Sequence, residues 1–381
     1  MRADEHLAQR ASGNSILDAA HEPPPFLFVE DLRVAYSKAE PILRSVNLSV
    51  RKGELLSILG PSGCGKTTLL KAIAGFVDSS GGRVLMEGLD LLQVPPSRRN
   101  IGFVFQNYAL FPHMSILDNV AYGLASRRWS RTRRRERASE MLALVGMADL
   151  AARRPAQLSG GQQQRVAVAR ALAIEPILLL MDEPLSNLDA KLRVEMREEV
   201  RNLQRKIGIT TLFVTHDQEE ALTMSDRILL LSNGDVEQIG SPREVYESPK
   251  TRFVADFLGG GNIFVGRVKT HGEQNILDCG DIAFPVRLRE HERRSSNLCA
   301  VIRHESVDVA RQKTNDNAKP GVIEQAAFLG ASWRYRIQLT GGRIVHASAR
   351  PSSDGFETLG EESNVYVSWN IDDVTVVRDV S

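Results

Sequence analysis

The sequence predicts an α/β fold followed by a smaller all-β domain. Short apolar runs at residues 54–60, 177–184 and 211–216 have the length of buried strands, and helical patterns such as 190–206 separate them. This alternation is typical of a parallel sheet covered by helices. After about Pro249 the helical patterns give way to short β-rich runs bounded by Gly, Asn and Asp, which indicate a barrel-like domain.

The N-terminal part contains a tail and a set of strands. Residues 1–25 are polar and alanine-rich and end in three prolines, so we expect a flexible tail. Residues 26–36, 45–50 and 82–88 alternate or cluster β-forming side chains between turn residues. They therefore predict antiparallel strands.

The remaining elements follow from the same patterns. The buried strand at 54–60 precedes a helical pattern at 66–76, and the later buried strands include one at 101–105. The β-rich part predicts strands within residues 262–268, 299–309, 321–330, 333–339, 342–349, 364–369 and 373–377.

The composition limits the classes of protein to consider. With 381 residues, 42% of them hydrophobic, the chain can bury the cores of two or three domains. A net charge of +1 gives no overall basic field that would argue for nucleic acid. Cys64, Cys279 and Cys299 are too far apart for a zinc knuckle or a disulfide framework. The first residues lack a signal-peptide pattern and the apolar runs are short, so we expect any membrane role to depend on partners.

The strongest local signal is GPSGCGKTT at residues 60–68, between a predicted strand and a predicted helix. It matches the G-x-x-x-x-G-K-[S/T] loop in the setting that this motif needs. Glycine N–H groups can wrap phosphates, Lys66 can bridge the β- and γ-phosphates, and the Thr67 hydroxyl can bind Mg²⁺. A glycine-rich turn with a chance lysine is the weaker interpretation here. We therefore predict that a nucleoside triphosphate is bound by Gly60, Pro61, Ser62, Gly63, Cys64, Gly65, Lys66, Thr67 and Thr68.

The second signal is the acidic end of the strand ILLLMDEP. Asp182 can hold Mg²⁺ through water, while Glu183 addresses the γ-phosphate and the water that attacks it. Taken alone, the pair could be an ordinary acidic turn, but the upstream phosphate loop favours the catalytic interpretation. The chain contains no N-K-x-D sequence, which argues against a guanine-specific GTPase.

A third signal is LSGGQ at residues 158–162, where a serine and two glycines open a helical pattern. Such a start offers backbone N–H groups and the positive end of a helix dipole to an anion. With the phosphate loop and the acidic strand end, the order of elements resembles the ATP-binding subunit of an ATP-binding cassette (ABC) transporter. In that family two cassettes pack head to tail. The resemblance therefore implies that the ATP of a second copy is contacted by Ser159, Gly160, Gly161 and Gln162.

The resemblance implies roles for further residues. It places the ring of Tyr36 against adenine, although a plain strand tyrosine is the alternative. It gives Gln106 contacts with Mg²⁺ and the attacking water, and it places Asp189 of SNLD against the opposite phosphate loop. His216 would hold the γ-phosphate and orient Glu183. The implied catalytic residues are thus Glu183, His216 and Gln106, and the implied metal ligands are Thr67, Gln106 and Asp182.

The same resemblance implies a domain organisation and partners. It predicts an ABC ATPase domain at 26–258 with a helical subdomain at about 107–173, and an OB-like TOBE domain at 259–381. It further implies a homodimer beneath two integral membrane permease subunits, with an extracytoplasmic solute-binding protein supplying the solute and this chain peripheral at the cytoplasmic face of the inner membrane. Within bacterial importers, the sequence resembles the polyamine, ferric-ion and aminoalkylphosphonate branch more than the sugar branch. It departs from its relatives at Arg303-His304, where Arg-Pro is common.

Alternatives to an importer subunit remain. A sugar importer is the nearest one. A soluble ABC ATPase of translation or repair would need a second cassette or a coiled coil, and a silent regulator would be expected to lose Glu183 or His216. The basic run RRWSRTRRRER at residues 127–137 could bind nucleic acid, but a solvated helix face is favoured because the run stands alone in a nearly neutral chain. We expect no nucleic-acid partner.

Overall fold

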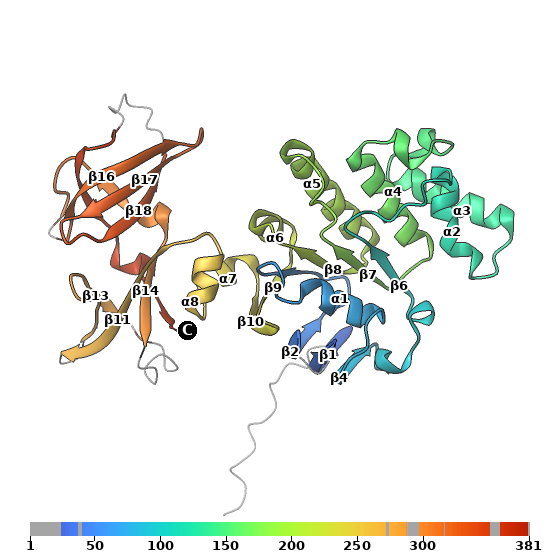
Figure 1. Cartoon of the computed structure of the whole chain (residues 1–381), viewed down its shortest axis with the longest axis horizontal. Helices are drawn as coiled ribbons and strands as arrows, with labels where there is room; N and C mark the ends of the chain where they lie inside the picture. The colour runs from blue at the N-terminus through green and yellow to red at the C-terminus, as the bar shows by residue number, and fades with distance from the viewer. Residues whose placement is uncertain are drawn as a thin grey trace, which may run out of the picture.

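The chain forms an α/β part and a β-rich part that lie at opposite ends of an elongated molecule (Figure 1). The computed structural model describes residues 24–36, 40–271, 274–286, 288, 297–315, 317–350 and 359–379. Nearly all of the tail predicted for residues 1–25 lies outside this description. In the part of the chain that the structure describes, no helix combines the length and apolar character needed to span a membrane.

A six-stranded sheet forms the centre of the α/β part, in the order β10-β9-β3-β8-β7-β6. The strands from β9 to β6 are parallel, and only β10 runs antiparallel. The predicted buried strands are confirmed, whereas β9 and β10 were missing from the prediction. The strands are β3 (Leu55–Leu59), β6 (Ile101–Val104), β7 (Leu178–Asp182), β8 (Thr210–Thr215), β9 (Arg227–Ser232) and β10 (Asp235–Gly240).

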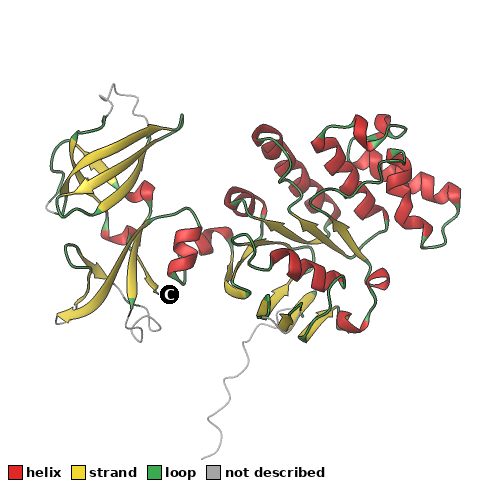
Figure 2. Cartoon of the chain, in the orientation of Figure 1, coloured by secondary structure: helices red, strands yellow, loops and turns green. Residues whose placement is uncertain are grey.

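Helices follow the parallel strands, so the loops at the carboxyl ends of β3, β6, β7 and β8 lie at one edge of the sheet (Figure 2). Open α/β sheets bind ligands at this edge. Cores formed by α1, α5 and the sheet position these loops. The helices are α1 (Lys66–Ala74), α5 (Ala190–Ile207), α6 (Gln218–Met224), α7 (Pro242–Glu247) and α8 (Arg252–Phe257).

A separate four-stranded sheet of order β2-β1-β4-β5 packs beside α1. The antiparallel pairing predicted for the first strands is confirmed. The alternation in these strands places one row of side chains in the core that the sheet shares with α1. The strands are β1 (Leu27–Val34), β2 (Leu43–Val50), β4 (Gly81–Met86) and β5 (Leu89–Asp90).

Three helices pack together at the end of the molecule remote from the β-rich part (Figure 1). They are α2 (Ile116–Ala125), α3 (Arg131–Leu144) and α4 (Gly160–Ala173), and each begins after a serine whose hydroxyl accepts a bond from a backbone N–H. Short 3₁₀ helices span Leu91–Gln93, Pro96–Arg98, Ala148–Leu150, Pro155–Gln157, His304–Ser306 and Ile371–Asp373.

The β-rich part consists of two five-stranded antiparallel sheets around one core. All the predicted runs form strands, and two strands between them, β12 and β13, were not predicted. One sheet contains β13 (Ala283–Val286), β12 (Gln274–Asp278), β11 (Asn262–His271), β14 (Leu298–Ile302) and β20 (Thr375–Arg378). The other contains β15 (Asp308–Ala310), β19 (Asn364–Ser368), β16 (Lys319–Phe328), β17 (Trp333–Leu339) and β18 (Ile344–Ala349).

Arg303, which follows β14, joins the β-rich part to the α/β part. Its guanidinium donates to the carbonyl oxygens of Tyr246, Ala255 and Gly260 at 2.8, 2.8 and 2.7 Å, and also to that of Leu258. The same group lies 4.3 Å from the centroid of the Tyr246 ring. One side chain thus satisfies four carbonyl oxygens at the connection, close to the boundary predicted at residue 258. That boundary stays a prediction.

We expect Arg303→Met to lower the free energy of unfolding by about 2 kcal/mol, because hydrogen bonds from a charged donor are lost and carbonyls are left without a partner. Calorimetry should show the β-rich part melting earlier than in the parent chain. Arg334→Met, which removes an exposed arginine of β17, is the control. Equal melting of the two variants would contradict this role for Arg303.

Candidate functional site

The loop before α1 holds a buried lysine at the edge of the parallel sheet. Nζ of Lys66 donates to the carbonyl oxygens of Gly60 and Pro61, both at 2.8 Å. A Cβ on Gly60 would lie 2.1 Å from the carbonyl oxygen of Leu231, so no side chain fits there. Gly65 precedes the helix at φ 107°, and no side chain caps the N-terminus of α1. The loop therefore presents backbone and an ammonium group, as a phosphate site requires.

Thr67 and Asp182 meet beside this loop. The Thr67 hydroxyl donates to Oδ1 of Asp182 at 2.7 Å, from the first turn of α1 to the end of β7. Burial raises the pKa of the Asp182 carboxyl, and the bond from Thr67 acts in the opposite direction. A hydroxyl beside a carboxylate is an oxygen donor set that suits Mg²⁺.

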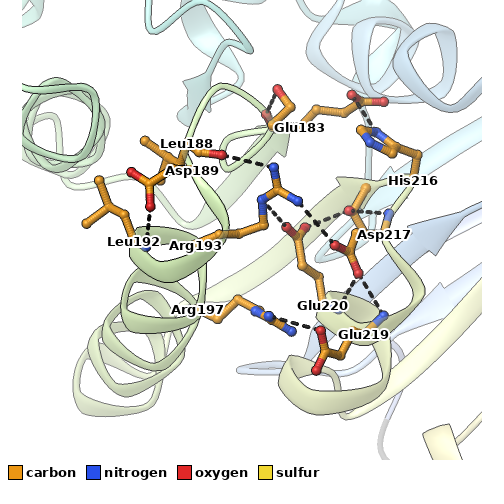
Figure 3. A network of polar contacts seen from close by, with 12 residues as sticks. Glu183, Leu188, Asp189, Leu192, Arg193, Arg197, His216, Asp217, Glu219 and Glu220 are labelled. Atoms are coloured by element: carbon orange, nitrogen blue, oxygen red, sulfur yellow. Dashed lines mark hydrogen bonds and ion pairs between the residues drawn. The ribbon is translucent and has the colours of Figure 1, made fainter. Parts of the chain in front are cut away.

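Glu183 and His216 meet at the ends of the neighbouring strands β7 and β8 (Figure 3). Gln106 follows β6, the next strand of the sheet, and reaches the same group. Nδ1 of His216 lies 2.9 Å from Oε2 of Glu183. Nε2 of Gln106 donates to the same oxygen at 3.4 Å. The Glu183 side chain is therefore held from two sides next to Asp182.

The backbone of Glu183 is in the left-handed region, with φ 45°. This conformation costs a residue with a side chain about 1–3 kcal/mol, and surrounding contacts must maintain it. The Glu183 N–H donates to the carbonyl oxygen of Val214 at 3.0 Å, and the Ser186 hydroxyl donates to the carbonyl oxygen of Glu183 at 2.9 Å. Backbone strain of this kind clusters at functional sites.

The LSGGQ segment opens α4 with a capping box that was not predicted from the sequence. The Ser159 hydroxyl accepts from the Gln162 N–H at 3.3 Å, and the Gln162 side chain accepts from the Ser159 N–H at 3.0 Å. Fewer N–H groups are thus unpaired than the prediction assumed. A Cβ on Gly161 would lie 3.0 Å from Leu192, so α4 packs tightly on α5 here. No hydrogen bond within the described residues joins this segment to the loop at 60–65.

Tyr36 and Asp189 lie apart from the group around Glu183. Tyr36 is 61% exposed after β1 and makes no ring contact with another described residue. Asp189 is exposed and caps α5, accepting from the Leu192 N–H at 3.0 Å. Asn187 was not predicted from the sequence, and its amide donates to the Gln106 carbonyl at 2.9 Å. Its position in SNLD, two residues before Asp189, was the available signal.

Arg193 of α5 connects two loops of the site (Figure 3). It donates to the Leu188 carbonyl at 2.9 Å and forms ion pairs with Asp217 and Glu220 at 3.6 and 3.9 Å. Burial raises the pKa of Glu220, and its carboxylate accepts from Thr215 at 2.6 Å. The segment that ends at Asp189 is thereby tied to the segment that contains His216.

Comparisons with known proteins identify the family of the chain. Residues 43–186 match the ABC transporter family, and residues 300–377 match the TOBE domain. The Spermidine/putrescine import ATP-binding protein PotA 1 of Pseudomonas aeruginosa is 49% identical over 80% of this chain and 83% of its own length. The chain belongs to the ABC transporter family. As an ABC protein it is an ATPase subunit of the importer type with a C-terminal TOBE domain.

Other similar proteins support the same assignment. The Fe(3+) ions import ATP-binding protein FbpC of Agrobacterium fabrum is 43% identical over 84% of this chain and 90% of its own length. A solved dimeric ATP-binding cassette, in a post-hydrolysis state with ADP and Pi, is 35% identical with a TM-score of 0.52, covering 57% of this chain and 99% of the other. The solved structure of cbiO1, part of the cbiONQ ABC transporter complex from Clostridium perfringens, is 31% identical with a TM-score of 0.54. The match covers 58% of this chain and 91% of the other.

Cys64 of this ABC ATPase should react slowly with maleimide. The residue is 6% exposed, and burial raises the pKa of its thiol, so the thiolate is scarce at neutral pH. The rate of modification should keep rising with pH up to and beyond the ordinary pKa of a cysteine thiol. Bound MgATP should protect Cys64 from modification. Peptide mass spectrometry measures the rate of modification. Modification should stop ATP hydrolysis, and Cys64→Ala, which lacks the thiol, is the control for effects of maleimide at other sites. Fast labelling at neutral pH with full ATPase activity would contradict a phosphate role for this loop.

Arg193→Met should lower the rate of ATP hydrolysis by about tenfold and leave ATP affinity unchanged, because it releases the loop that ends at Asp189 from the loop that contains His216. Lys191→Met, an exposed neighbour on α5, is the control. Steady-state kinetics separate kcat from KM. An equal fall in kcat in both variants would contradict this linkage between the two loops. So would a change of KM in Arg193→Met with kcat unchanged.

Proposed function

We propose that two copies of this chain hydrolyse ATP at their shared interface to drive import of a polyamine or ferric ion through two membrane permease subunits. An extracytoplasmic solute-binding protein would deliver the solute, and the chain would lie at the cytoplasmic face of the inner membrane. The observation that carries the proposal is the meeting of Lys66, Thr67, Asp182, Glu183 and His216 at one edge of the parallel sheet.

The proposed site divides binding from chemistry. The backbone of residues 60–65 and the Lys66 ammonium would bind the phosphates of ATP, since the ammonium is already held within this loop. Thr67 and Asp182 would hold Mg²⁺, which neutralises phosphate charge when it is bound. The Tyr36 ring, exposed near the start of β2, is our candidate for stacking on adenine.

Glu183 is the proposed general base. Its carboxylate would accept the proton of the water that attacks the γ-phosphate, and His216 and Gln106 would fix its orientation through the contacts at Oε2. Ser159, Gly160, Gly161 and Gln162 would close on the γ-phosphate from the second copy, joined by Asp189. The solved dimeric cassette in its post-hydrolysis state supports this arrangement by similarity.

The solute class is inferred from the relatives. Proteins named for spermidine/putrescine import and for Fe(3+) import both align over most of the chain, at 49% and 43% identity. Both solutes are cations. An aminoalkylphosphonate, which the sequence favoured together with these two cations, and a sugar, the alternative, are not named by these two relatives.

Reconstituted transport tests the proposal. The chain, its permease subunits and the binding protein would be placed in proteoliposomes, and ATP hydrolysis would be measured with spermidine, ferric ion or maltose. We expect stimulation by one of the two cations and none by maltose. Stimulation by maltose alone would overturn the solute class. Absence of hydrolysis under all conditions would overturn the proposed activity.

A further inference from the structure

A buried carboxylate lies behind the edge of the sheet that carries the site. Glu220 of α6 is 3% exposed, and the proposed mechanism gives it no role. Burial raises the pKa of this carboxyl, while the hydrogen bond from Thr215 acts in the opposite direction. An ionised carboxylate is stable in a protein interior only where neighbouring groups compensate its charge. The partners of Glu220 therefore indicate what it holds in place.

The nearest partner is Thr215, the last residue of β8. The Thr215 hydroxyl donates to Oε2 of Glu220 at 2.6 Å, and the same hydroxyl oxygen accepts from the N–H of Asp217 at 3.0 Å. A hydroxyl has one proton, and donating it to Glu220 leaves the lone pairs of the oxygen for the Asp217 N–H. The carboxylate thus fixes the turn immediately before and after His216.

His216 depends on this turn for its direction. Its side chain is 55% exposed, and among the residues that the structure describes its hydrogen-bond partner is Glu183, at 2.9 Å from Nδ1 to Oε2. A ring with so much solvent around it receives little direction from packing. The backbone at residues 215–217 therefore sets the direction of the ring, and the groups that fix this backbone support the site.

The second partner of Glu220 lies on α5 (Figure 3). Nε of Arg193 is 3.9 Å from Oε1 of Glu220, and another nitrogen of the same guanidinium is 3.6 Å from Oδ2 of Asp217. The buried Nε of Arg193 has no hydrogen-bond partner in the described part of the chain. At this distance the contact with Glu220 is an ion pair without a hydrogen bond. Glu220 therefore presents one oxygen to the turn and the other to α5.

We propose that Glu220 is a positioning residue for ATP hydrolysis: its carboxylate fixes the turn that carries His216 and thereby keeps His216 against Glu183. This inference deepens the proposed function and rests on it. The bond from Thr215 carries the main effect, since it connects the carboxylate to the turn through a short, directed hydrogen bond. An uncharged acceptor oxygen at position 220 is therefore sufficient, provided that it reaches the Thr215 hydroxyl.

Two variants that break this bond test the proposal. Glu220→Leu removes the acceptor and keeps a side chain of similar size. It should lower kcat by about tenfold and leave KM for ATP unchanged, because the loop at 60–68 does not depend on this turn. Thr215→Val removes only the hydroxyl and should give the same fall in kcat. The double variant should fall no further than either single variant, since both changes break one bond.

Glu220→Gln is the conservative variant that separates the acceptor from the charge. Its amide oxygen can still accept from Thr215, and Arg193 keeps its pair with Asp217, so kcat should return to within about threefold of the parent value. Glu219→Leu is the matched control, because it makes the same change at the neighbouring residue of α6, whose side chain is 73% exposed. It should hydrolyse ATP at the parent rate.

The imidazole nitrogen resonances of His216 report its contact with Glu183 without relying on hydrolysis. The chain contains eight histidines, so selective isotope labelling gives few signals, and His216→Gln identifies the signal of residue 216. We expect the Nδ1 resonance to move toward the value of a free imidazole in Glu220→Leu and Thr215→Val. It should stay at the parent position in Glu220→Gln. Unchanged signals from the other histidines would show that the fold is intact.

Three results would overturn the proposal. The first is a parental kcat in both Glu220→Leu and Thr215→Val. The second is an equal fall in Glu220→Leu and Glu220→Gln, because the charge facing Arg193 would then matter and the acceptor would not. The third is a joint change of kcat and KM with shifted signals from several histidines, which would assign Glu220 to folding alone. If Glu220→Leu does not fold, Thr215→Val decides the question, since it leaves the carboxylate in place.

This proposal and the proposed function fail in different ways. A His216 resonance at the parent position in both Glu220→Leu and Thr215→Val, in a chain that hydrolyses ATP, refutes only the role of Glu220. A parent chain without hydrolysis refutes the proposed function, and the His216 resonance then still decides whether Glu220 directs the ring.

Discussion

Glu183→Gln is expected to bind ATP with unchanged affinity and to hydrolyse it at least about a hundredfold more slowly. The amide keeps the shape of the side chain and can still contact His216, but it cannot accept a proton from water. The phosphate loop around Lys66 is untouched by the change. Single-turnover hydrolysis and nucleotide titration measure the two effects separately.

Glu198→Gln is the matched control, because it removes an exposed carboxylate from α5. It should hydrolyse ATP at the parent rate. A Glu183→Gln enzyme with a parental single-turnover rate would exclude Glu183 as the general base. A loss of ATP affinity equal to the loss of rate would instead assign Glu183 to binding.

Local patterns predicted much of the site because phosphate chemistry imposes strict local rules. The loop at 60–68 needs glycines where the backbone packs closely, as the 2.1 Å approach expected at Gly60 shows. The acidic end of β7 follows a strand that is wholly buried. Both features depend on neighbours in sequence, so they could be recognised without the fold.

Contacts between distant segments could not be predicted in the same way. The bonds of Arg303 to the segment 246–260 depend on how β14 meets α7 and α8, which no periodicity encodes. Arg193 reaches Asp217 and Glu220 across a helix and a strand. The strands β12 and β13 were not predicted. β12 pairs with β11 and with β13, and β13, at the edge of the sheet, contains Pro285, which a strand pattern does not favour.

Ser159→Arg is expected to leave ATP binding by one chain nearly intact and to prevent both dimer closure and hydrolysis. The serine is exposed at the N-terminus of α4, and a cation of that size would occupy the surface where a second copy must approach. Nucleotide titration and sedimentation with ATP measure the two outcomes. Ser159→Ala is the control, since it removes the capping hydroxyl at a cost of about 1 kcal/mol without adding bulk.

Mixing two inactive variants tests whether Ser159 acts on its own chain's ATP or on the partner's. Lys66→Ala removes the ammonium that the loop holds, and Ser159→Arg removes the opposing surface. If the site combines residues of two chains, a mixed dimer contains one site with both defects and one site with neither, so some hydrolysis should return, provided that one intact site suffices. If Ser159 served its own chain, every site in the mixture would keep one defect and hydrolysis would stay absent. Strong loss of ATP affinity in the Ser159→Arg monomer would likewise place the serine in its own chain's site.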